Sequence, residues 1–491
     1  MSEWDVVLHG GRVIDPETGL DAVRDVALAG GRIAAVAETL PPGPGSYDVT
    51  GLVVTAGFID LHSHVDDIGG LRLQAADGVT TALELEAGIT PVAAAYQRAA
   101  ANGRPVNYGF SASWALARME AVAGLSTRGS LATLLASIGN PAWQRPAEPA
   151  QVSAMMSRLA ADLADGAIGI GILLGYAPAA SREEYLRVAA LAAEAGVTTF
   201  THTRDLIEMV PDGVADGAEE IVRAAGQTGA HMHYCHINST SMRHIDRVLG
   251  LVSQAQAAGS RVTAEAYPYG SGMTGIGAAF LAPERLGERG LVPSSLFYAP
   301  AAERVADEAR LRELRRTDPG GLVIIDQLDE SDPGDRELLL RSLTFPGAVI
   351  ASDAMPLTWT TPRDELAWPL PPGAITHPRT AGTFSRALRL LTRERATLDL
   401  PAALAKCSLG PARLLQDFVP AMQRKGRLQP GADADVIVFD PATITDQATY
   451  QQSTRPSTGF RHVLVNGEFV VRDAGIVANA RPGQPIRANA H

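Results

Sequence analysis

Two histidines lie one residue apart directly after a short apolar run. His62 and His64 occur in "GFIDLHSHVDD" (residues 57–67), and only eleven of the 491 residues are histidines. If "VVTAGFIDL" is a strand, both imidazoles point to the same face at its C-terminal end, because side chains alternate with period two. Such neighbouring imidazoles either share a metal ion or lie together in a polar pocket. The spacing alone leaves both interpretations open.

Four further apolar runs also end in side chains that can bind a metal. "GVTTALELEAG" ends in Glu84 and Glu86, and "PGAVIASDAMP" ends in Asp353. "VTTFTHTRD" ends in His202, and "HMHYCHINST" offers His231, His233 and His236. At most one or two of these last three can face one metal. We take His236 as the ligand, because it is nearest to the C-terminal end of its run.

Taken together, these strand ends favour a divalent metal ion over separate structural roles. Taken singly, a strand histidine is commonly hydrogen-bonded in a core, and Asp353 is also suited to cap a helix. Zinc is typically bound by imidazoles and carboxylates, and in catalytic sites one coordination position stays open for water or substrate. Such an ion lowers the pKa of a bound water to about 7 and polarises a carbonyl oxygen. Asp353 then serves as general base and acid, because no spare histidine remains among the ligands.

The sequence between 56 and 415 is organised so that strand ends come together. Strand-like runs alternate with helical runs; "GAIGIGILLGYA", for example, precedes "SREEYLRVAALAAEAG", which has a Ser start and a Gly stop. Repeated βα units predict an α/β fold with a covered parallel sheet, and the length suits a (β/α)8 TIM-like barrel. A doubly wound sheet is the alternative, but no Gly-x-Gly-x-x-Gly turn opens the first unit. The segment from about 280 to 345 is expected to be an insertion or lid.

The two ends of the chain are rich in short strands. Residues 1–55 contain Gly-Gly turns between apolar runs, and residues 416–491 contain the Asn-Gly of a tight hairpin in "VNGEF". We therefore expect 1–55 and 416–491 to pair into a small β-sandwich domain, with the barrel occupying 56–415.

The composition disfavours several classes of partner. The formal net charge is −12, which argues against binding to a nucleic-acid backbone. No apolar stretch approaches the length of a membrane span, and the start "MSEWDVVLHGG" does not resemble a secretory signal. Cys235 and Cys407 are the only cysteines and fit a reducing compartment. We expect a cytoplasmic enzyme with a small-molecule substrate, and homo-oligomer formation is left open.

Lysine is almost absent from the sequence. Of the 42 basic residues, only Lys406 and Lys425 are lysines. No chemistry before position 406 can therefore use a lysine amine. This excludes a Schiff base there, and also a carboxylated lysine, which is a frequent bridging ligand in two-metal hydrolases.

These motifs resemble the amidohydrolase superfamily, and within it the N-acyl-D-amino-acid deacylase (D-aminoacylase) group. "GFIDLHSHVDD" is similar to the His-x-His motif of the superfamily, and "GADADVIVFD" to its C-terminal signature. "AEAYPYGSGMTG" and "THPRTAGTFSRALR" resemble elements more specific to the deacylases. The resemblance covers nearly the whole chain. It implies that one or two zinc ions are bound by His62, His64, His202 and His236, and that Asp353 is the catalytic base.

The chain departs from the deacylase pattern at the second strand. Ala87 occupies the place of a cysteine ligand in that group. The adjacent Glu86 is followed by Ala-Gly and resembles the bridging glutamate of related metal-dependent dipeptidases. We therefore take Glu86 as the candidate bridging ligand and Glu84 as the alternative.

Two further departures concern the substrate. The His-Lys step of the group appears here as His236-Ile237-Asn238, so a cationic contact is missing. The substrate loop reads Met273-Thr274 where a serine usually precedes the threonine, and Ser271 is expected to substitute.

The remaining candidates indicate a substrate that carries a carboxylate. Arg379 in "HPR" offers a guanidinium fork that suits a carboxylate, and Tyr267 is placed to donate to the same group or to an oxyanion. His377 is expected to contact the substrate or to support a ligand. We predict a metal-dependent hydrolase of a linear amide, most simply an N-acyl-D-amino acid deacylase. The alternatives are a cyclic-amide hydrolase of the hydantoinase or dihydroorotase type, and a non-catalytic scaffold relative.

Overall fold

The computed structural model describes residues 4–43, 45–126, 131–206, 216–359 and 366–489. Its centre is a sheet of eight parallel strands, in which each strand lies beside the one from the preceding βα unit. The strands are β6 (Phe58–Asp60), β7 (Val79–Ile89), β8 (Asn107–Ser113), β9 (Ile170–Leu173), β10 (Thr198–His202), β11 (His231–Tyr234), β12 (Val262–Ala266) and β17 (Ala348–Ile350).

The first and last strands of this sheet meet, so the sheet closes. Ser63 forms a parallel bridge with Ala354, and the His64 amide donates to the Ala354 carbonyl at 2.8 Å. Asp60 at the end of β6 also links this strand to the residues after β17, because its carboxylate accepts from the Ser352 amide at 2.9 Å and also from the Ser352 hydroxyl. The predicted (β/α)8 barrel is therefore confirmed.

Helices cover the barrel, and local sequence sets their ends. The helix predicted in "SREEYLRVAALAAEAG" begins after Ser181, whose hydroxyl accepts from the Glu184 amide at 3.1 Å, and the chain leaves it through Gly196 at φ +63°. Among the described residues, none of the helices combines the length and apolar character needed to cross a membrane. The barrel and loop helices are α1 (Ile68–Ala76), α2 (Val92–Asn102), α3 (Trp114–Ala123), α4 (Leu131–Ser137), α5 (Pro141–Gln144), α6 (Pro149–Ala164), α7 (Arg182–Glu194), α8 (Gly217–Thr228), α9 (Ile237–Ser241), α10 (Ile245–Ala257), α12 (Pro333–Thr344), α13 (Arg379–Leu388), α14 (Leu400–Cys407) and α15 (Leu409–Leu415).

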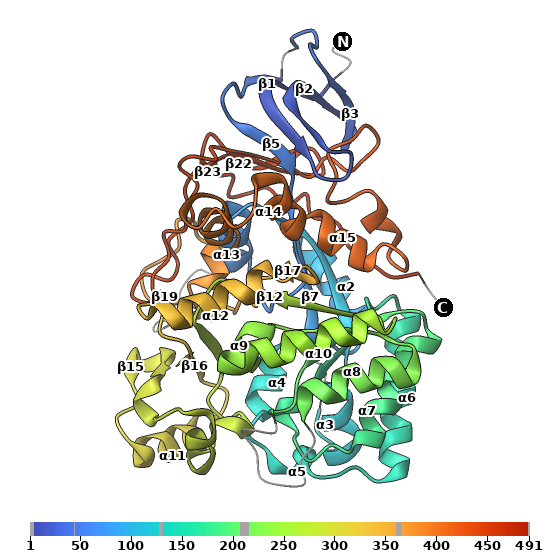
Figure 1. Ribbon diagram of the computed structural model, residues 1–491, viewed down its shortest axis with the longest axis vertical. Coiled ribbons are helices and arrows are strands. Elements are labelled where there is room, and N and C mark those ends of the chain that lie inside the picture. The colour runs from blue at the N-terminus through green and yellow to red at the C-terminus, as the bar shows by residue number, and fades with distance from the viewer. Residues whose placement is uncertain (1–3, 44, 127–130, 207–215, 360–365, 490–491) are drawn as a thin grey trace.

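Strands from both chain ends form one sheet of nine strands beside the barrel (Figure 1). Within it β5 (Val53–Ala56) pairs antiparallel with β20 (Val436–Phe439), which joins the two ends of the chain. The sheet curves back on itself, because Arg32 in an edge strand bridges to Asp433 just before β20. The other strands are β1 (Val6–Asp15), β2 (Leu20–Ala29), β3 (Arg32–Ala37), β4 (Ser46–Asp48), β21 (Phe460–Val465), β22 (Glu468–Arg472) and β23 (Gly475–Ile476).

The terminal sheet encloses an apolar core of its own, separate from the core of the barrel. This second layer of side chains agrees with the expected small domain built from both termini. The boundaries at 55/56 and 415/416 stay a prediction.

Between β12 and β17 the chain builds a small antiparallel sheet. Its strands, in spatial order, are β13 (Ser271–Gly275), β16 (Leu322–Asp326), β14 (Leu296–Tyr298) and β15 (Glu303–Arg304), and α11 (Glu308–Thr317) lies between β15 and β16 in the chain. The extra structure thus starts at Ser271, earlier than position 280. Helix α12 packs against α10 and β17 and so belongs to the ring of barrel helices. A two-stranded ribbon, β18 (Thr358–Trp359) with β19 (Ala374–Ile375), follows β17.

Candidate metal centre

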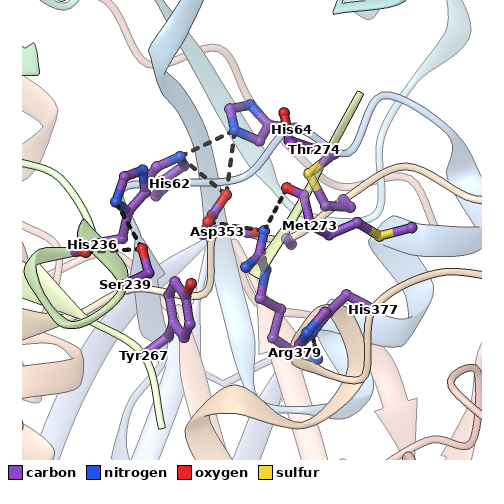
Figure 2. A network of polar contacts seen from close by, with 12 residues as sticks. His62, His64, His236, Ser239, Tyr267, Met273, Thr274, Asp353, His377 and Arg379 are labelled. Atoms are coloured by element: carbon purple, nitrogen blue, oxygen red, sulfur yellow. Dashed lines mark hydrogen bonds and ion pairs between the residues drawn. The ribbon is translucent and has the colours of Figure 1, made fainter. Parts of the chain in front are cut away.

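The predicted metal-binding side chains converge at the C-terminal ends of the barrel strands, and all of them are buried. Figure 2 shows four of them, His62, His64, His236 and Asp353. His236 and Asp353 have φ angles of +33° and +51°. This conformation costs energy in residues other than glycine and is concentrated at functional sites. The converging residues are His62 and His64 after β6, Glu86 in β7, His202 at the end of β10, His236 after β11 and Asp353 after β17.

Glu86 lies at the centre of this group, and its two carboxylate oxygens face different histidines. Oε2 is 3.2 Å from His62 Nε2 and 3.5 Å from His64 Nε2. Oε1 is 2.7 Å from His236 Nε2 and 3.1 Å from His202 Nδ1. Two sets of ligand atoms, each within 4.8 Å of one another, therefore share Glu86. A carboxylate between two such sets has the geometry of a bridging ligand.

Asp353 faces the first of these sets and contacts an arginine on its other side. Its Oδ1 is 3.3 Å from His62 Nε2 and 3.4 Å from His64 Nε2, and its Oδ2 is 2.8 Å from Arg379 Nη2 (Figure 2). Burial raises the pKa of Asp353, but the Arg379 guanidinium and the histidines outweigh it, so the pKa lies below that of an ordinary aspartate. The carboxylate is therefore ionised at neutral pH and available to accept a proton.

The donor set fits a divalent transition metal. His62 Nε2 and His64 Nε2 are 3.0 Å apart, a separation at which two lone pairs need a shared proton or cation. Burial lowers the pKa of both imidazoles, but the surrounding carboxylates raise it well above the usual value. The acids thus favour positive charge at this point. Imidazole nitrogens combined with carboxylate oxygens are typical of zinc sites.

Glu84 has a different environment from Glu86. Its Oε2 accepts from His64 Nδ1 at 2.8 Å, and its Oε1 accepts from the Ala87 amide at 3.2 Å. Because Nδ1 is the donor in this contact, His64 presents Nε2 to the centre. Of the two glutamates that the sequence left open, Glu86 is the one with histidines on both sides.

Tyr267 and Arg379, both predicted to bind substrate, lie close to the centre. Tyr267 lines the adjacent cavity, and burial raises the pKa of Tyr267 to about 12 even though Ser239 is near its hydroxyl. Arg379 is fully buried and stacks on the Tyr267 ring at 4.8 Å. Within the described part of the chain, neither the Tyr267 hydroxyl nor Arg379 Nη1 has a hydrogen-bonding partner of good geometry.

Ser271 and His377 are directed at each other instead of the cavity. The Ser271 hydroxyl is 2.9 Å from His377 Nε2 and 2.5 Å from the Tyr450 hydroxyl. His377 Nδ1 accepts from the Arg379 amide at 3.1 Å, so its Nε2 carries the hydrogen and donates to Ser271. Neither residue belongs to the cavity wall formed by the described residues. Ser271 and His377 thus contact each other at the start of α13, which also carries Arg379. That Ser271 contacts substrate, and that His377 contacts substrate or supports a ligand, stays a prediction.

The wall of the cavity beside the centre also contains a group of apolar side chains that the sequence did not indicate. One side comes from α4 and the other from the inserted sheet and its flanking loops. Arg289 also lies on this wall, with its charge paired to Asp205 at 2.7 Å. The apolar lining includes Leu131, Leu134, Leu135, Ile138, Leu173, Met273, Phe280, Ile325 and Met355.

Sequence reasoning missed Glu265 at the end of β12. Its Oε2 is 3.1 Å from His233 Nε2, and its Oε1 accepts from His62 Nδ1. Glu265 stands two residues before Tyr267 and meets the criterion applied to the other candidates, which is a carboxylate at the end of a barrel strand. The signal was therefore present in the sequence.

Known proteins with similar sequences align along most of the chain. A model of the amidohydrolase family matches residues 46–471. An N-acyl-D-glutamate deacylase of Alcaligenes xylosoxydans xylosoxydans is 30% identical, over 99% of this chain and 97% of that protein. A D-aminoacylase of the same organism is 28% identical over 94% of both chains. A dihydroorotase of Geobacter sulfurreducens is 29% identical, over 54% of this chain and 61% of its own.

Solved structures share the whole architecture. The N-acyl-D-glutamate deacylase of Bordetella bronchiseptica, in complex with zinc and a phosphonate that mimics the tetrahedral intermediate, is 27% identical with a TM-score of 0.77, over 99% of this chain and 100% of that chain. A D-aminoacylase crystal structure is 25% identical with a TM-score of 0.75, over the same shares of the two chains. A D-hydantoinase of a Bacillus species, 17% identical with a TM-score of 0.62 over 99% of both chains, shares the fold.

Proposed function

This chain belongs to the amidohydrolase family, and we propose that the carbon–nitrogen bond it hydrolyses is the linear amide of an N-acyl-D-amino acid. One observation carries the proposal: Glu86 lies between two pairs of histidines, and the Asp353 carboxylate faces the same point. This arrangement combines a cation site with a proton acceptor, which metal-dependent hydrolysis requires. Relatives of 28–30% identity that align over 94–99% of this chain are an N-acyl-D-glutamate deacylase, a D-aminoacylase and an N-acyl-D-aspartate deacylase.

Zinc, as one or two ions, is the metal that we propose. It prefers imidazole and carboxylate ligands, and it is present in the Bordetella bronchiseptica deacylase. When bound, it polarises the amide carbonyl and lowers the pKa of a water ligand. The residues that we assign as ligands lie on both sides of Glu86: His62 and His64 toward Oε2, His202 and His236 toward Oε1.

Asp353 is the group that moves the proton. It is kept ionised by Arg379, accepts a proton from the attacking water and then delivers this proton to the nitrogen of the leaving amine. The carbon–nitrogen bond breaks, the acyl carbon keeps the water oxygen, and Asp353 returns to its starting state. Arg379 takes no part in proton transfer, because its guanidinium stays protonated.

The substrate carboxylate binds, in this proposal, beside Tyr267 and Arg379. The Tyr267 hydroxyl and Arg379 Nη1 are buried donors without a good partner among the described residues, a costly state that a carboxylate would relieve. Asn238, in the place of the deacylase lysine, is engaged with backbone: its Oδ1 accepts from the Tyr267 amide at 3.3 Å, and its Nδ2 donates to the Tyr269 carbonyl at 3.5 Å. Recognition therefore depends on the hydroxyl and the guanidinium.

A cyclic-amide hydrolase is the second candidate, favoured by similarity to dihydroorotases, one of which is 25% identical over 94% of this chain and 96% of its own. Enzymes of that type generally use a carboxylated lysine. Lys406 Nζ donates to the Phe345 and Ala348 carbonyls, both at 2.7 Å, and Lys425 Nζ is 2.6 Å from Asp435. Because both lysines are engaged away from the centre, we favour the linear amide.

The test is a panel of N-acetyl- and N-formyl-amino acids of both D and L series, with hydantoin and dihydroorotate as cyclic competitors, assayed on zinc-loaded protein. We expect turnover of D-series compounds, its loss after chelation and its recovery when zinc returns. Turnover of the cyclic compounds alone, or full turnover in metal-free protein, would contradict the proposal.

A further inference from the structure

A string of polar side chains, all buried except the half-buried Thr263, runs through the barrel toward the metal centre. It includes the two histidines at the start of "HMHYCH", which have no part in the reaction as proposed. Its members are Thr198 from β10, His231 and His233 from β11, and Thr263 and Glu265 from β12.

Each member of this string contacts the next. Thr198 Oγ1 is 3.0 Å from His231 Nδ1, and His231 Nε2 is 3.0 Å from Thr263 Oγ1. Thr263 Oγ1 is 2.8 Å from His233 Nδ1, and His233 Nε2 is 3.1 Å from Glu265 Oε2. Burial lowers the pKa of His231 to about 3, so this imidazole is neutral at physiological pH.

Starting from Glu265, these contacts can be given one consistent direction. A carboxylate only accepts, so His233 donates from Nε2. With that one hydrogen on the His233 ring, Nδ1 accepts from the Thr263 hydroxyl. The Thr263 oxygen then accepts from His231 Nε2, and His231 Nδ1 accepts from the Thr198 hydroxyl. Every hydroxyl and imidazole donates one hydrogen, and the string ends on Glu265.

Glu265 extends this order to the metal centre. Its Oε1 accepts from His62 Nδ1 and also lies 3.4 Å from the His236 amide nitrogen. Because the carboxylate has no hydrogen to donate, His62 must carry its hydrogen on Nδ1. Nε2 is then the nitrogen of His62 left for a cation, and it faces Glu86 Oε2 and Asp353 Oδ1 at 3.2 and 3.3 Å.

We propose that Glu265 is a positioning residue that makes Nε2 the metal-binding nitrogen of His62, and that His233 holds the Glu265 carboxylate in place. The inference rests on the proposed function, because it takes His62 as a ligand. Glu84 has the same relation to His64, whose Nδ1 is 2.8 Å from Glu84 Oε2. Each histidine of the His-x-His motif therefore has its own carboxylate.

Glu265→Gln tests this inference at nearly constant side-chain volume. The amide offers one acceptor and one donor to two imidazole N–H groups, so His62 or His233 loses its partner or moves its hydrogen. We expect zinc affinity to fall about 10- to 100-fold, measured by competition with a chromophoric chelator. The visible spectrum of the cobalt-substituted protein should change as well.

Glu184→Gln is the matched control. Glu184 is also a buried carboxylate, but it accepts from Arg118 Nη1 at 2.5 Å and from Trp114 Nε1 at 3.0 Å. Its replacement should lower the unfolding temperature and leave zinc affinity unchanged. A residue with a merely structural role would behave like this control.

His233→Gln and His233→Leu decide the matter even if Glu265→Gln does not fold. Glutamine keeps an N–H near the position of Nε2 and leucine removes it, so only His233→Leu should weaken zinc binding. Wild-type zinc affinity in His233→Leu, or in folded Glu265→Gln, would overturn the inference while leaving the proposed function intact. Wild-type protein that binds no zinc would instead overturn the proposed function itself.

Discussion

Two buried clusters of charge differ in whether the chain alone can satisfy them. Beside the terminal sheet, Lys425 Nζ lies 2.6 Å from Asp435 and 3.0 Å from Asp433. Asp435 also accepts from Asn107 Nδ2 at 2.9 Å and from the Asn466 amide at 2.8 Å. Every charge in this cluster is paired with an opposite charge and with hydrogen bonds. The cluster therefore needs no bound ion, and we call it closed.

At the metal centre the same kinds of group remain open. Two carboxylates, Glu86 and Asp353, face the same imidazole nitrogens, and two of these nitrogens are 3.0 Å apart. Such a cluster becomes satisfied only when a cation joins it. A buried cluster in which every charge is paired stabilises the fold, whereas a buried cluster with unpaired groups marks a functional site.

The largest expected effect comes from breaking the open cluster at Asp353. Asp353→Asn keeps the size of the side chain but removes the proton acceptor, so turnover should fall about 10²- to 10⁴-fold. Zinc content, measured by atomic emission, should stay close to that of the wild type because the assigned ligands remain. Wild-type turnover in the zinc-loaded variant would eliminate Asp353 as the base.

The closed cluster can be broken at Lys425. Lys425→Met leaves Asp435 without its buried cation, whereas Asp433 keeps Arg32 and Arg424. Loss of a buried partner typically costs about 3–5 kcal/mol of unfolding free energy. Denaturant titration measures this loss, and zinc affinity of the folded variant should match the wild type. Lys406→Met is the control, because Lys406 donates only to carbonyls and should cost less. Equal losses in the two variants would contradict the distinction.

The two glutamates of β7 sharpen the comparison within the centre itself. Glu86→Ala removes the carboxylate between the two histidine pairs and should weaken zinc binding by more than about 100-fold. This exceeds the loss of about 10- to 100-fold that follows removal of a residue that contacts only a ligand. Glu84→Ala removes only the partner of His64 Nδ1 and should weaken binding by about 10-fold. Isothermal titration with zinc measures both. A larger effect for Glu84→Ala would exchange the roles assigned to them.

The smallest effect is expected for Arg379→Met, which removes the guanidinium paired with Asp353. Activity requires ionised Asp353 and is lost as pH falls through its pKa, which in the wild type lies below the ordinary aspartate value. Removing the guanidinium raises this pKa, so the acid limb of the kcat–pH profile should move to higher pH. KM should also rise for substrates with a carboxylate, but not for neutral amides. An unmoved acid limb would show that Arg379 does not influence Asp353.

The barrel and the convergence of ligands were predictable from the sequence. The βα repeat fixes a parallel sheet, and in a closed barrel all strand C-terminal ends meet at one face. That rule alone predicts that His62, His202 and Asp353 lie close together.

Contacts between loops were not predictable in this way. Ser271 and His377 are separated by 106 residues and meet because the inserted sheet lies beside the start of α13. Sequence spacing carries no information about such distances. The cavity wall from α4 was missed for the same reason, because α4 lies in a long loop between β8 and β9 whose course the strand pattern does not determine.

Asp60 and Ser352, which are 292 residues apart in the chain, join β6 to β17. His62 and His64 therefore lie on one side of this junction, and Asp353 lies on the other. During synthesis, His62 and His64 leave the ribosome well before Asp353. The histidine pair and the proton acceptor therefore come together only when the chain after β17 pairs with the chain after β6 and closes the barrel.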